Sequence, residues 1–191
     1  MIQPIVTLFA KYPRAGEVNT RLIPALGPDG AALLHRRLTE RTLETARASG
    51  LPVEVRFAGA SREDFAAWLG DVALVEQGDG DLGVRLGRVE VPAILLGADV
   101  PDLQAGHLRS AAEALADVPV AVGPAEDGGY YLLGFREPVG FLFEDMAWGT
   151  GDVLAGTRRR LEGHGVAYRL LEELSDCDRP EDLARWPELL A

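Results

Sequence analysis

The chain is short of the residues that build disulfides and zinc sites. Its 191 residues include one cysteine, Cys177, and three histidines. A single cysteine excludes a disulfide within the chain and any zinc site built from several cysteines. His35, His107 and His164 lie far apart in the sequence, without the paired spacing of metal-binding histidines, and each is predicted to be a surface residue.

Long apolar runs are also missing. No segment approaches the roughly 18 consecutive apolar residues that a membrane-spanning helix needs. The first residues, MIQPIVTLFAK, lack the basic region and small-residue cleavage site of a signal peptide. We therefore expect no membrane span and a cytoplasmic location.

The chain has fewer basic than acidic residues. The formal net charge is -11 and the sequence pI is about 4.7. A general nucleic-acid-binding protein needs a broad basic face, so nucleic-acid partners are not expected. A small phosphorylated ligand held by one local basic loop remains compatible with this balance.

What the sequence does contain is a regular alternation of strand-like and helix-like segments, without a repeat or an evident linker. Strands separated by helices of ten or more residues predict a mainly parallel sheet with helices on both faces, a three-layer α/β/α, Rossmann-like fold. The length fits one domain, which we place at residues 1–191. The expected strands are Ile5–Phe9, Val53–Ala58, Ala73–Glu76, Ala93–Leu96, Val118–Val122, Tyr130–Phe135 and Tyr168–Leu171. The expected helices are Gly30–Ser49, Ser61–Leu69, Leu82–Val89, Ala105–Ala116, Thr150–Gly163 and Pro180–Leu190.

A basic loop follows the first expected strand in the segment IVTLFAKYPRAGEVNTRLIPALG. It lies at the carboxyl end of that strand, where open α/β sheets bind ligands and where backbone N–H groups and cations hold phosphate. It has neither the Walker A nor the G-x-G-x-x-G pattern, so a solvated connection with scattered charge is the alternative. The candidate phosphate-binding residues are Lys11, Arg14, Gly16, Asn19, Thr20 and Arg21. A second glycine-containing loop, Glu76–Leu86, supplies Gly80 and Gly83 beside a ribose or base, or is a simple connector.

A carboxylate follows the wholly apolar strand of AILLGADVPDL. Asp99 is placed at the ligand-binding edge, where a carboxylate together with phosphate oxygens binds Mg²⁺ or Mn²⁺. Asp102, three residues later, is expected to cap the turn or helix that follows.

The segment GPAEDGGYYLLG joins two expected strands through adjacent acids and glycines. Asp-Gly-Gly is a good hairpin turn, which is the structural alternative. Functionally, Asp127 or Glu126 is a candidate to accept a proton from an attacking hydroxyl. Glycines allow a substrate to approach the backbone. The candidate acceptor-pocket residues are Gly128, Gly129, Tyr130 and Trp148.

Two further motifs lie toward the C-terminus. In FEDMAWGT, Trp148 either covers an acceptor pocket or closes the core, and Thr150 is the expected N-cap of the next helix. In SDCDRPEDLARW, Asp178 is a second candidate metal ligand or a structural cap, and Pro180 suits the first turn of a helix.

Taken in order, LFAKYPRAGEVNTRL, GADVPDL, AEDGGYYLLG, AWGT and DCDRPEDL resemble a family of small bacterial proteins. That family is described as glycosyltransferases of the GT-A nucleotide-diphospho-sugar transferase superfamily, and some members are linked to arsenosugar biosynthesis. The resemblance runs from Val6 to about Leu183. The chain is also similar to molybdenum-cofactor and phospholactate guanylyltransferases, which use a comparable first loop and a comparable acidic motif near the end.

The resemblance implies a role for individual residues. Lys11 and Arg21 match cations that contact phosphate, Asp99 matches the metal aspartate, and Asp178 matches a carboxylate that completes the metal site in related cytidylyltransferases. Asp127 falls in an Asp-Gly-Gly-Tyr motif with an acceptor-side or catalytic role. The chain departs from the family at Asn19, where a lysine is usual.

The sequence therefore predicts a transferase that depends on Mg²⁺ or Mn²⁺ and uses a nucleotide-activated sugar and a small-molecule acceptor. The alternatives are a nucleotidyltransferase, which takes a nucleoside triphosphate and releases pyrophosphate, and a non-catalytic nucleotide-binding protein.

Overall fold

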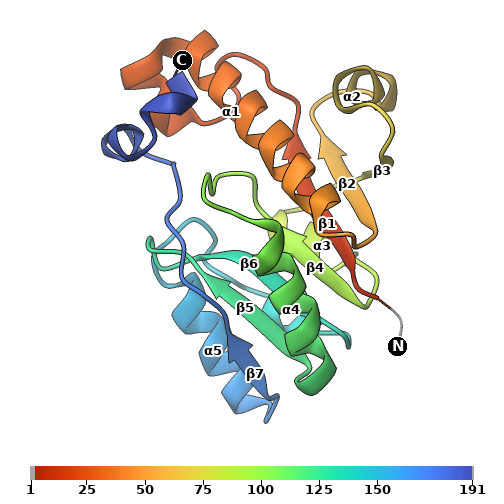
Figure 1. Cartoon of the computed structure of the whole chain (residues 1–191). Helices are drawn as coiled ribbons and strands as arrows, with labels where there is room; N and C mark the ends of the chain where they lie inside the picture. The colour runs from red at the N-terminus through yellow and green to blue at the C-terminus, as the bar shows by residue number, and fades with distance from the viewer. Residues whose placement is uncertain (1–2, 191) are drawn as a thin grey trace.

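The computed structural model describes residues 3–190 and is built on one seven-stranded sheet, in the order β3-β2-β1-β4-β6-β5-β7 (Figure 1). The strands are β1 Ile5–Lys11, β2 Val53–Ala58, β3 Ala73–Glu76, β4 Ala93–Leu96, β5 Val120–Pro124, β6 Tyr130–Phe135 and β7 Tyr168–Leu170. The α-helices are α1 Ile23–Ala48, α2 Arg62–Leu69, α3 Leu82–Leu86, α4 Ala105–Asp117 and α5 Val153–Gly163. Short 3-10 helices cover Thr20–Leu22, Gly140–Leu142, Pro180–Arg185 and Pro187–Leu190.

The sheet is mainly parallel, as the alternation of segments predicts. Strand β6 alone runs against its neighbours β4 and β5 among the described strands. Consequently β1, β4 and β5 all end at the same edge of the sheet, and β6 begins there. Every loop with a predicted chemical role meets this carboxyl edge, where ligands bind in open α/β sheets.

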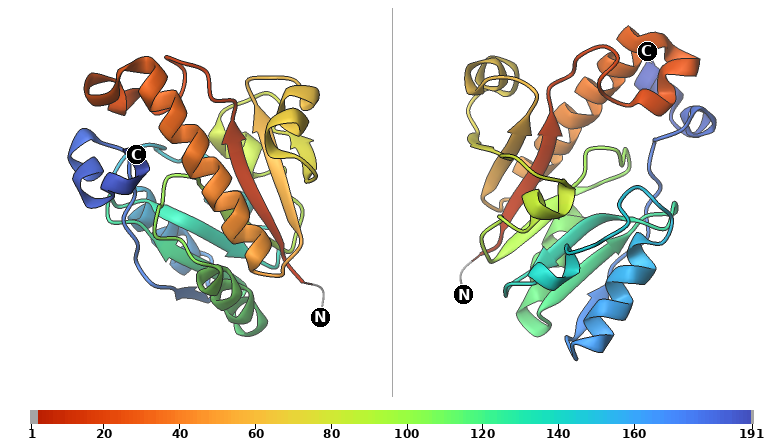
Figure 2. Two further views of the ribbon diagram at one scale, coloured as in Figure 1. Left: turned by 45° about the horizontal axis from the view of Figure 1, so that its top comes forward. Right: turned by 180° about the vertical axis from the view of Figure 1, so that it is seen from behind.

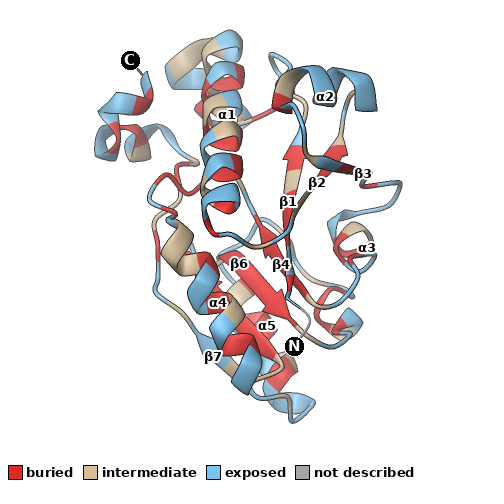
Figure 3. Ribbon diagram, turned by 45° about the vertical axis from the view of Figure 1, so that its right-hand side comes forward, coloured by how far each residue is buried: buried red, intermediate tan, exposed pale blue. Residues whose placement is uncertain are grey.

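Helices cover both faces of the sheet, which confirms the three-layer prediction. Helices α1, α2 and α4 lie on one face, and α3 and α5 lie on the other (Figure 2). The residues of β4 are all buried, as expected for a central strand that reads Ala-Ile-Leu-Leu (Figure 3). The two cores on either side of this strand hold the carboxyl edge rigid.

The starts of two helices, α1 and α5, differ from the prediction for local reasons. Helix α1 starts at Ile23 rather than Gly30, with a break at Gly27, whose φ is 69°. A positive φ is readily adopted by glycine, and Pro28 follows it. Helix α5 starts at Val153, with Asp152 and not Thr150 at its N-cap. The Thr150 hydroxyl donates instead to the Ala147 carbonyl, 2.8 Å away.

The predicted last helix, Pro180–Leu190, is also wrong: it is two 3-10 helices that pack on the start of α1. From β7 the chain runs beside β5 and crosses the carboxyl edge to reach them (Figure 1). Cys177 and Trp186 are buried in this small third cluster. The C-terminal segment thus passes directly over the end of β4.

No helix in residues 3–190 is long and apolar enough to cross a membrane.

Candidate active site at the carboxyl edge

Asp99 lies where β4 leaves the sheet, held by backbone contacts from two directions. The Gly97 N–H donates to the Tyr131 carbonyl at 3.2 Å, and the Cys177 N–H donates to the Asp99 carbonyl at 2.7 Å. The second bond brings the C-terminal segment beside the aspartate. Asp99 is exposed at the edge, but the protein around it partly desolvates its carboxylate and raises its pKa, and the charges of Asp178 and Asp127 raise that pKa further.

Four aspartates therefore converge, and we call Asp99, Asp127, Asp176 and Asp178 the acid cluster. Burial raises the pKa of Asp176 to about 6, with contributions from Asp127 and Asp99. The sequence prediction missed Asp176. Its signal was the Asp-x-Asp pattern of SDCD, which places two carboxylates on the same side of an extended segment.

Arg21 is the first-loop cation that reaches the acid cluster. Its guanidinium forms an ion pair with Asp178, and this contact, with weaker effects of Asp127 and Asp176, raises the arginine's pKa. The two other cations point elsewhere: Lys11 Nζ donates to the Glu17 carbonyl at 3.0 Å. The Arg14 guanidinium lies 5.8 Å from the centre of the Tyr12 ring.

The shape of the first loop also explains why it contains Asn19. Asn19 has a φ of 44°, and asparagine tolerates this left-handed conformation better than lysine does. Asn19 also precedes the 3-10 helix that carries Thr20 and Arg21. His35 of α1 is half-buried rather than on the surface, and its Nε2 lies 2.9 Å from the Lys11 carbonyl. The end of β1 is thus fixed to α1.

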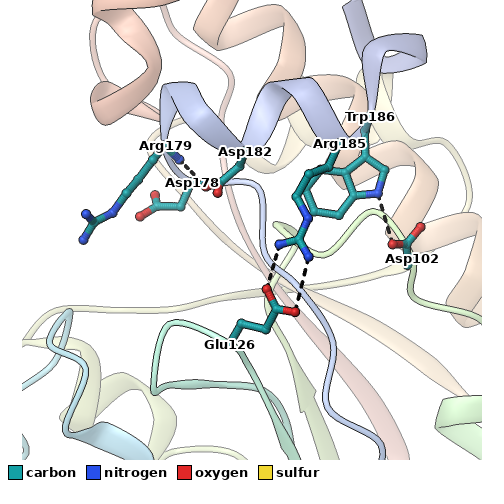
Figure 4. A network of polar contacts seen from close by, with 7 residues as sticks. All are labelled: Asp102, Glu126, Asp178, Arg179, Asp182, Arg185 and Trp186. Atoms are coloured by element: carbon teal, nitrogen blue, oxygen red, sulfur yellow. Dashed lines mark hydrogen bonds and ion pairs between the residues drawn. The ribbon is translucent and has the colours of Figure 1, made fainter.

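The β5–β6 connection is a hairpin turn, so the structural reading of this motif is confirmed. The Asp127 carboxylate accepts a hydrogen bond from the Gly129 N–H at 2.8 Å. Glu126 binds Arg185 through both oxygens, at 2.7 and 3.3 Å (Figure 4). Arg185 lowers the pKa of Glu126, with help from Ser175. A lowered pKa and two engaged oxygens make Glu126 a poor proton acceptor.

Asp102 also forms a hydrogen bond with the C-terminal segment. The Trp186 indole N–H donates to Asp102 at 3.1 Å (Figure 4). The predicted capping role of Asp102 is therefore wrong, because Gln104 stands at the N-cap of α4. Asp178 does not cap either: Asp182 accepts from the N–H groups of Asp178 and Arg179.

Beside the acid cluster lies a cavity of about 330 Å³ between the sheet, α3 and the Trp148 loop. Its walls are mostly apolar and aromatic, and we call it the apolar cavity. It is lined by Phe9, Leu82, Leu86, Leu95, Leu96, Gly97, Asp99, Asp127, Gly129, Tyr130, Tyr131, Trp148, Gly149, Thr150 and Val153. Trp148 both lines the cavity and closes the core, since its ring packs on Tyr130 and Phe143 with centroids 6.5 Å apart.

The predicted glycines divide into two groups. Gly129 lines the apolar cavity, whereas Gly128 is packed against the Gly151 carbonyl, which would lie 2.1 Å from an added Cβ. Gly83 is likewise buried, with the Phe143 carbonyl 2.3 Å from the position of an added Cβ. Gly80 has a φ of 105° and turns the chain into α3. Three of these glycines therefore shape the loops around the cavity.

The donor chemistry of the acid cluster fits a hard divalent cation, which binds carboxylate oxygens. Burial and, to a smaller extent, the charges of neighbouring aspartates raise the pKa values of Asp99 and Asp176, and a cation would relieve the repulsion. Within residues 3–190, no group of three or more His, Cys, Asp or Glu side chains is placed so that it could hold a metal ion by itself. A cation here would need further ligands, and Mg²⁺ commonly takes them from waters and substrate phosphates.

The fold is similar to that of nucleotide-diphospho-sugar transferases, and its acidic site lies at the carboxyl edge. A proposed nucleotide-diphospho-sugar transferase from Desulfovibrio desulfuricans G20 is 28% identical, with a TM-score of 0.88 over 98% of this chain and 88% of that one. The family model that matches residues 42–150 is described as "Uncharacterized protein conserved in bacteria (DUF2064)", and the chain belongs to this family.

More distant structures share the fold. Rv0371C of Mycobacterium tuberculosis H37Rv, solved with manganese, is 23% identical, with a TM-score of 0.55 over 98% of this chain and 99% of that one. A CMP:2-keto-3-deoxy-manno-octonic acid synthetase solved with CTP is 16% identical, with a TM-score of 0.58 over 99% of this chain and 98% of that one. No curated protein matches the chain.

Proposed function

We propose that residues 1–191 act as one GT-A-like domain that transfers a sugar from a nucleotide-activated donor to a small acceptor, with Mg²⁺ or Mn²⁺. The observation that carries this proposal is the meeting of the acid cluster and Arg21 with the apolar cavity at one sheet edge. An anionic donor with its cation suits the cluster, and a sugar-sized acceptor suits the cavity. Nucleotide donors and a free, buried Cys177 both fit a cytoplasmic setting.

The donor diphosphate is assigned to the first loop. Arg21 supplies positive charge beside the acid cluster, and Lys11 and Arg14 would add to it by turning from Glu17 and Tyr12 toward the phosphates. Gly16, Asn19 and Thr20 supply the remainder of the phosphate-binding loop. Asp99 and Asp178 hold the divalent cation, with Asp176 beside them. When bound, the cation supplies charge that stabilises the departing diphosphate. The loop with Gly80 and Gly83 lies alongside the nucleoside.

Asp127 is assigned as the catalytic base. The acceptor oxygen attacks the anomeric carbon of the sugar, and the bond from that carbon to the diphosphate oxygen breaks. The bonding electron pair leaves with the nucleoside diphosphate, and the acceptor proton passes to the Asp127 carboxylate. The Gly129 N–H orients this carboxylate at 2.8 Å. Gly129, Tyr130 and Trp148 face the acceptor, and Gly128 positions the loop that carries Trp148.

Nucleotidyl transfer is the second candidate, because the synthetase solved with CTP has the same fold over almost the whole chain. In that reaction a phosphorylated acceptor attacks the α-phosphorus of a nucleoside triphosphate, and pyrophosphate leaves. The same cations and acid cluster would serve it. The apolar cavity disfavours it, since the cavity offers such an acceptor no cation among its lining residues.

Product analysis separates the two reactions. The protein is incubated with Mn²⁺ and a panel of nucleotide sugars or nucleoside triphosphates, together with candidate acceptors. Acceptor-dependent release of a nucleoside diphosphate supports glycosyl transfer, and pyrophosphate release from a triphosphate supports the second candidate. Asp127→Asn should lower kcat with little change in KM. Asp117→Asn, which breaks an exposed ion pair with Arg169, is the control. Full turnover by Asp127→Asn would show that Asp127 is not the catalytic base.

A further inference from the structure

Arg21 and Asp178 are paired with each other in the structure, although the proposed function gives them different ligands. The Arg21 guanidinium donates to one oxygen of the Asp178 carboxylate, across 157 residues of sequence. Within residues 3–190, this contact is the only side-chain hydrogen bond of either group. Arg21 is assigned to the donor diphosphate and Asp178 to the divalent cation. Each side chain therefore has to give up its contact with the other to meet its ligand fully.

The pair can open without a change in the backbone. The side chains of Arg21 and Asp178 are 52% and 29% exposed, so both can rotate into solvent. The Asp182 carboxylate accepts from the Asp178 N–H at 3.1 Å and fixes the chain there (Figure 4). On the other side of the contact, Leu22 is fully buried and anchors the residue next to Arg21. Rotation of two side chains is enough to exchange their partners.

The charges set the order of this exchange. A diphosphate that took Arg21 first would leave the Asp178 carboxylate unpaired beside a polyanion, and like charges repel. A divalent cation that takes Asp178 first replaces the arginine's single charge with two and releases the guanidinium. A free guanidinium is well suited to phosphate, because its planar N–H groups can bind two phosphate oxygens at once.

We infer that Asp178 keeps Arg21 from phosphate in the free protein, and that a divalent cation on Asp178 releases Arg21 to bind the donor diphosphate. This inference rests on the proposed function for the two ligands, and it describes how their binding to that site is regulated. The cation binds first and the diphosphate second. Nucleotide alone, without metal, meets a site whose nearest arginine is already engaged.

The first test titrates Mn²⁺ alone into the protein by calorimetry. Arg21→Gln removes the competitor for Asp178 and should bind Mn²⁺ about twofold to fivefold more tightly, the value of a partly exposed ion pair. The matched control is Arg36→Gln, because Arg36 is also 52% exposed but pairs with Glu40 on α1. It should leave Mn²⁺ affinity unchanged. Since a variant that fails to fold cannot gain affinity, unchanged or weaker Mn²⁺ binding in Arg21→Gln, or an equal gain in Arg36→Gln, would overturn the inference.

The second test titrates a nucleoside diphosphate with EDTA and again with saturating Mn²⁺. Arg21→Gln should weaken nucleotide binding roughly tenfold with Mn²⁺, the value of a hydrogen bond to a charged group, and much less with EDTA. Equal losses in the two conditions would show that Arg21 is always free to bind phosphate, and would overturn the inference.

The reciprocal variant is Asp178→Asn, which frees Arg21 without any metal. With EDTA it should bind the nucleoside diphosphate more tightly than the unaltered protein, and adding Arg21→Gln should remove this gain. A gain that persists in the double variant would come from the lost carboxylate charge alone and would contradict the exchange. If Mn²⁺ does not strengthen nucleotide binding in the unaltered protein, the proposed function itself fails. If it does, but Arg21→Gln leaves Mn²⁺ affinity unchanged, this inference alone fails.

Discussion

Gly128→Ala should destabilise the protein strongly, because two separate features of the structure require glycine. The φ of Gly128 is 88°, and an added Cβ would lie 2.1 Å from the Gly151 carbonyl oxygen. A left-handed conformation costs an alanine about 1–2 kcal/mol. The overlap forces the Gly151 backbone to move, and overpacking of this kind costs roughly 1–3 kcal/mol more. We therefore expect a loss of about 3 kcal/mol.

The matched control is Gly165→Ala. Gly165 also has a positive φ, 65°, but nothing lies within 4 Å of an added Cβ. Only the conformational strain applies there, so the loss should be about 1–2 kcal/mol.

Urea unfolding at a constant m-value measures both changes in the free energy of unfolding. For a chain of this size, about 3 kcal/mol corresponds to a Tm roughly 6–12 °C lower. Equal losses in the two variants would show that Gly128 does not pack against Gly151. The role given to Gly128, of positioning the Trp148 loop, would then fail.

Three further results follow from the contacts of single side chains. Tyr131→Phe should lower the free energy of unfolding by about 1 kcal/mol, because it removes a hydrogen bond. Tyr130→Phe should leave the free energy of unfolding unchanged or raise it, because its hydroxyl has no partner within residues 3–190. Equal losses for the two variants in urea unfolding would contradict this. Burial lowers the pKa of His35, so the unfolded chain takes up a proton before the folded one, and the free energy of unfolding should fall as the pH drops below about 6.5. His35→Gln should flatten this part of the plot of stability against pH. The pKa of Glu126, followed by carboxyl NMR, should lie below its ordinary value and rise toward it in Arg185→Gln, where the contact with Ser175 remains; an unchanged pKa would show that the ion pair does not form in solution.

The strands were predictable because short apolar runs in the sequence mark them directly. The apolar run Ala93–Leu96 identifies a central strand, and its abrupt end at Gly97 places Asp99 at the ligand-binding edge. Because six of the seven strands run the same way, motifs far apart in sequence meet at one edge. This geometric rule is what allowed candidate residues to be chosen from the sequence.

The contacts within the site were not predictable to the same degree. The ion pairs of Arg21 with Asp178 and of Glu126 with Arg185 join residues far apart in the chain, and no local pattern selects the partner. Pro180–Arg185 is a 3-10 helix, and its Leu183 packs in one cluster with Ala31, Leu34 and Leu38 of α1, a long-range contact that no local pattern specifies. Asp176 joins the acid cluster because the Cys177 N–H binds the Asp99 carbonyl.

The central claim is that Asp99 couples a divalent cation to a nucleotide donor. Calorimetric titration of nucleoside diphosphates, with and without Mn²⁺, measures this coupling in the unaltered protein, in Asp99→Asn and in the distant control Asp117→Asn. We expect Mn²⁺ to tighten nucleotide binding at least tenfold in the unaltered protein and in Asp117→Asn, and we expect Asp99→Asn to abolish this effect. Nucleotide binding that does not respond to Mn²⁺, or an unchanged response in Asp99→Asn, would contradict it.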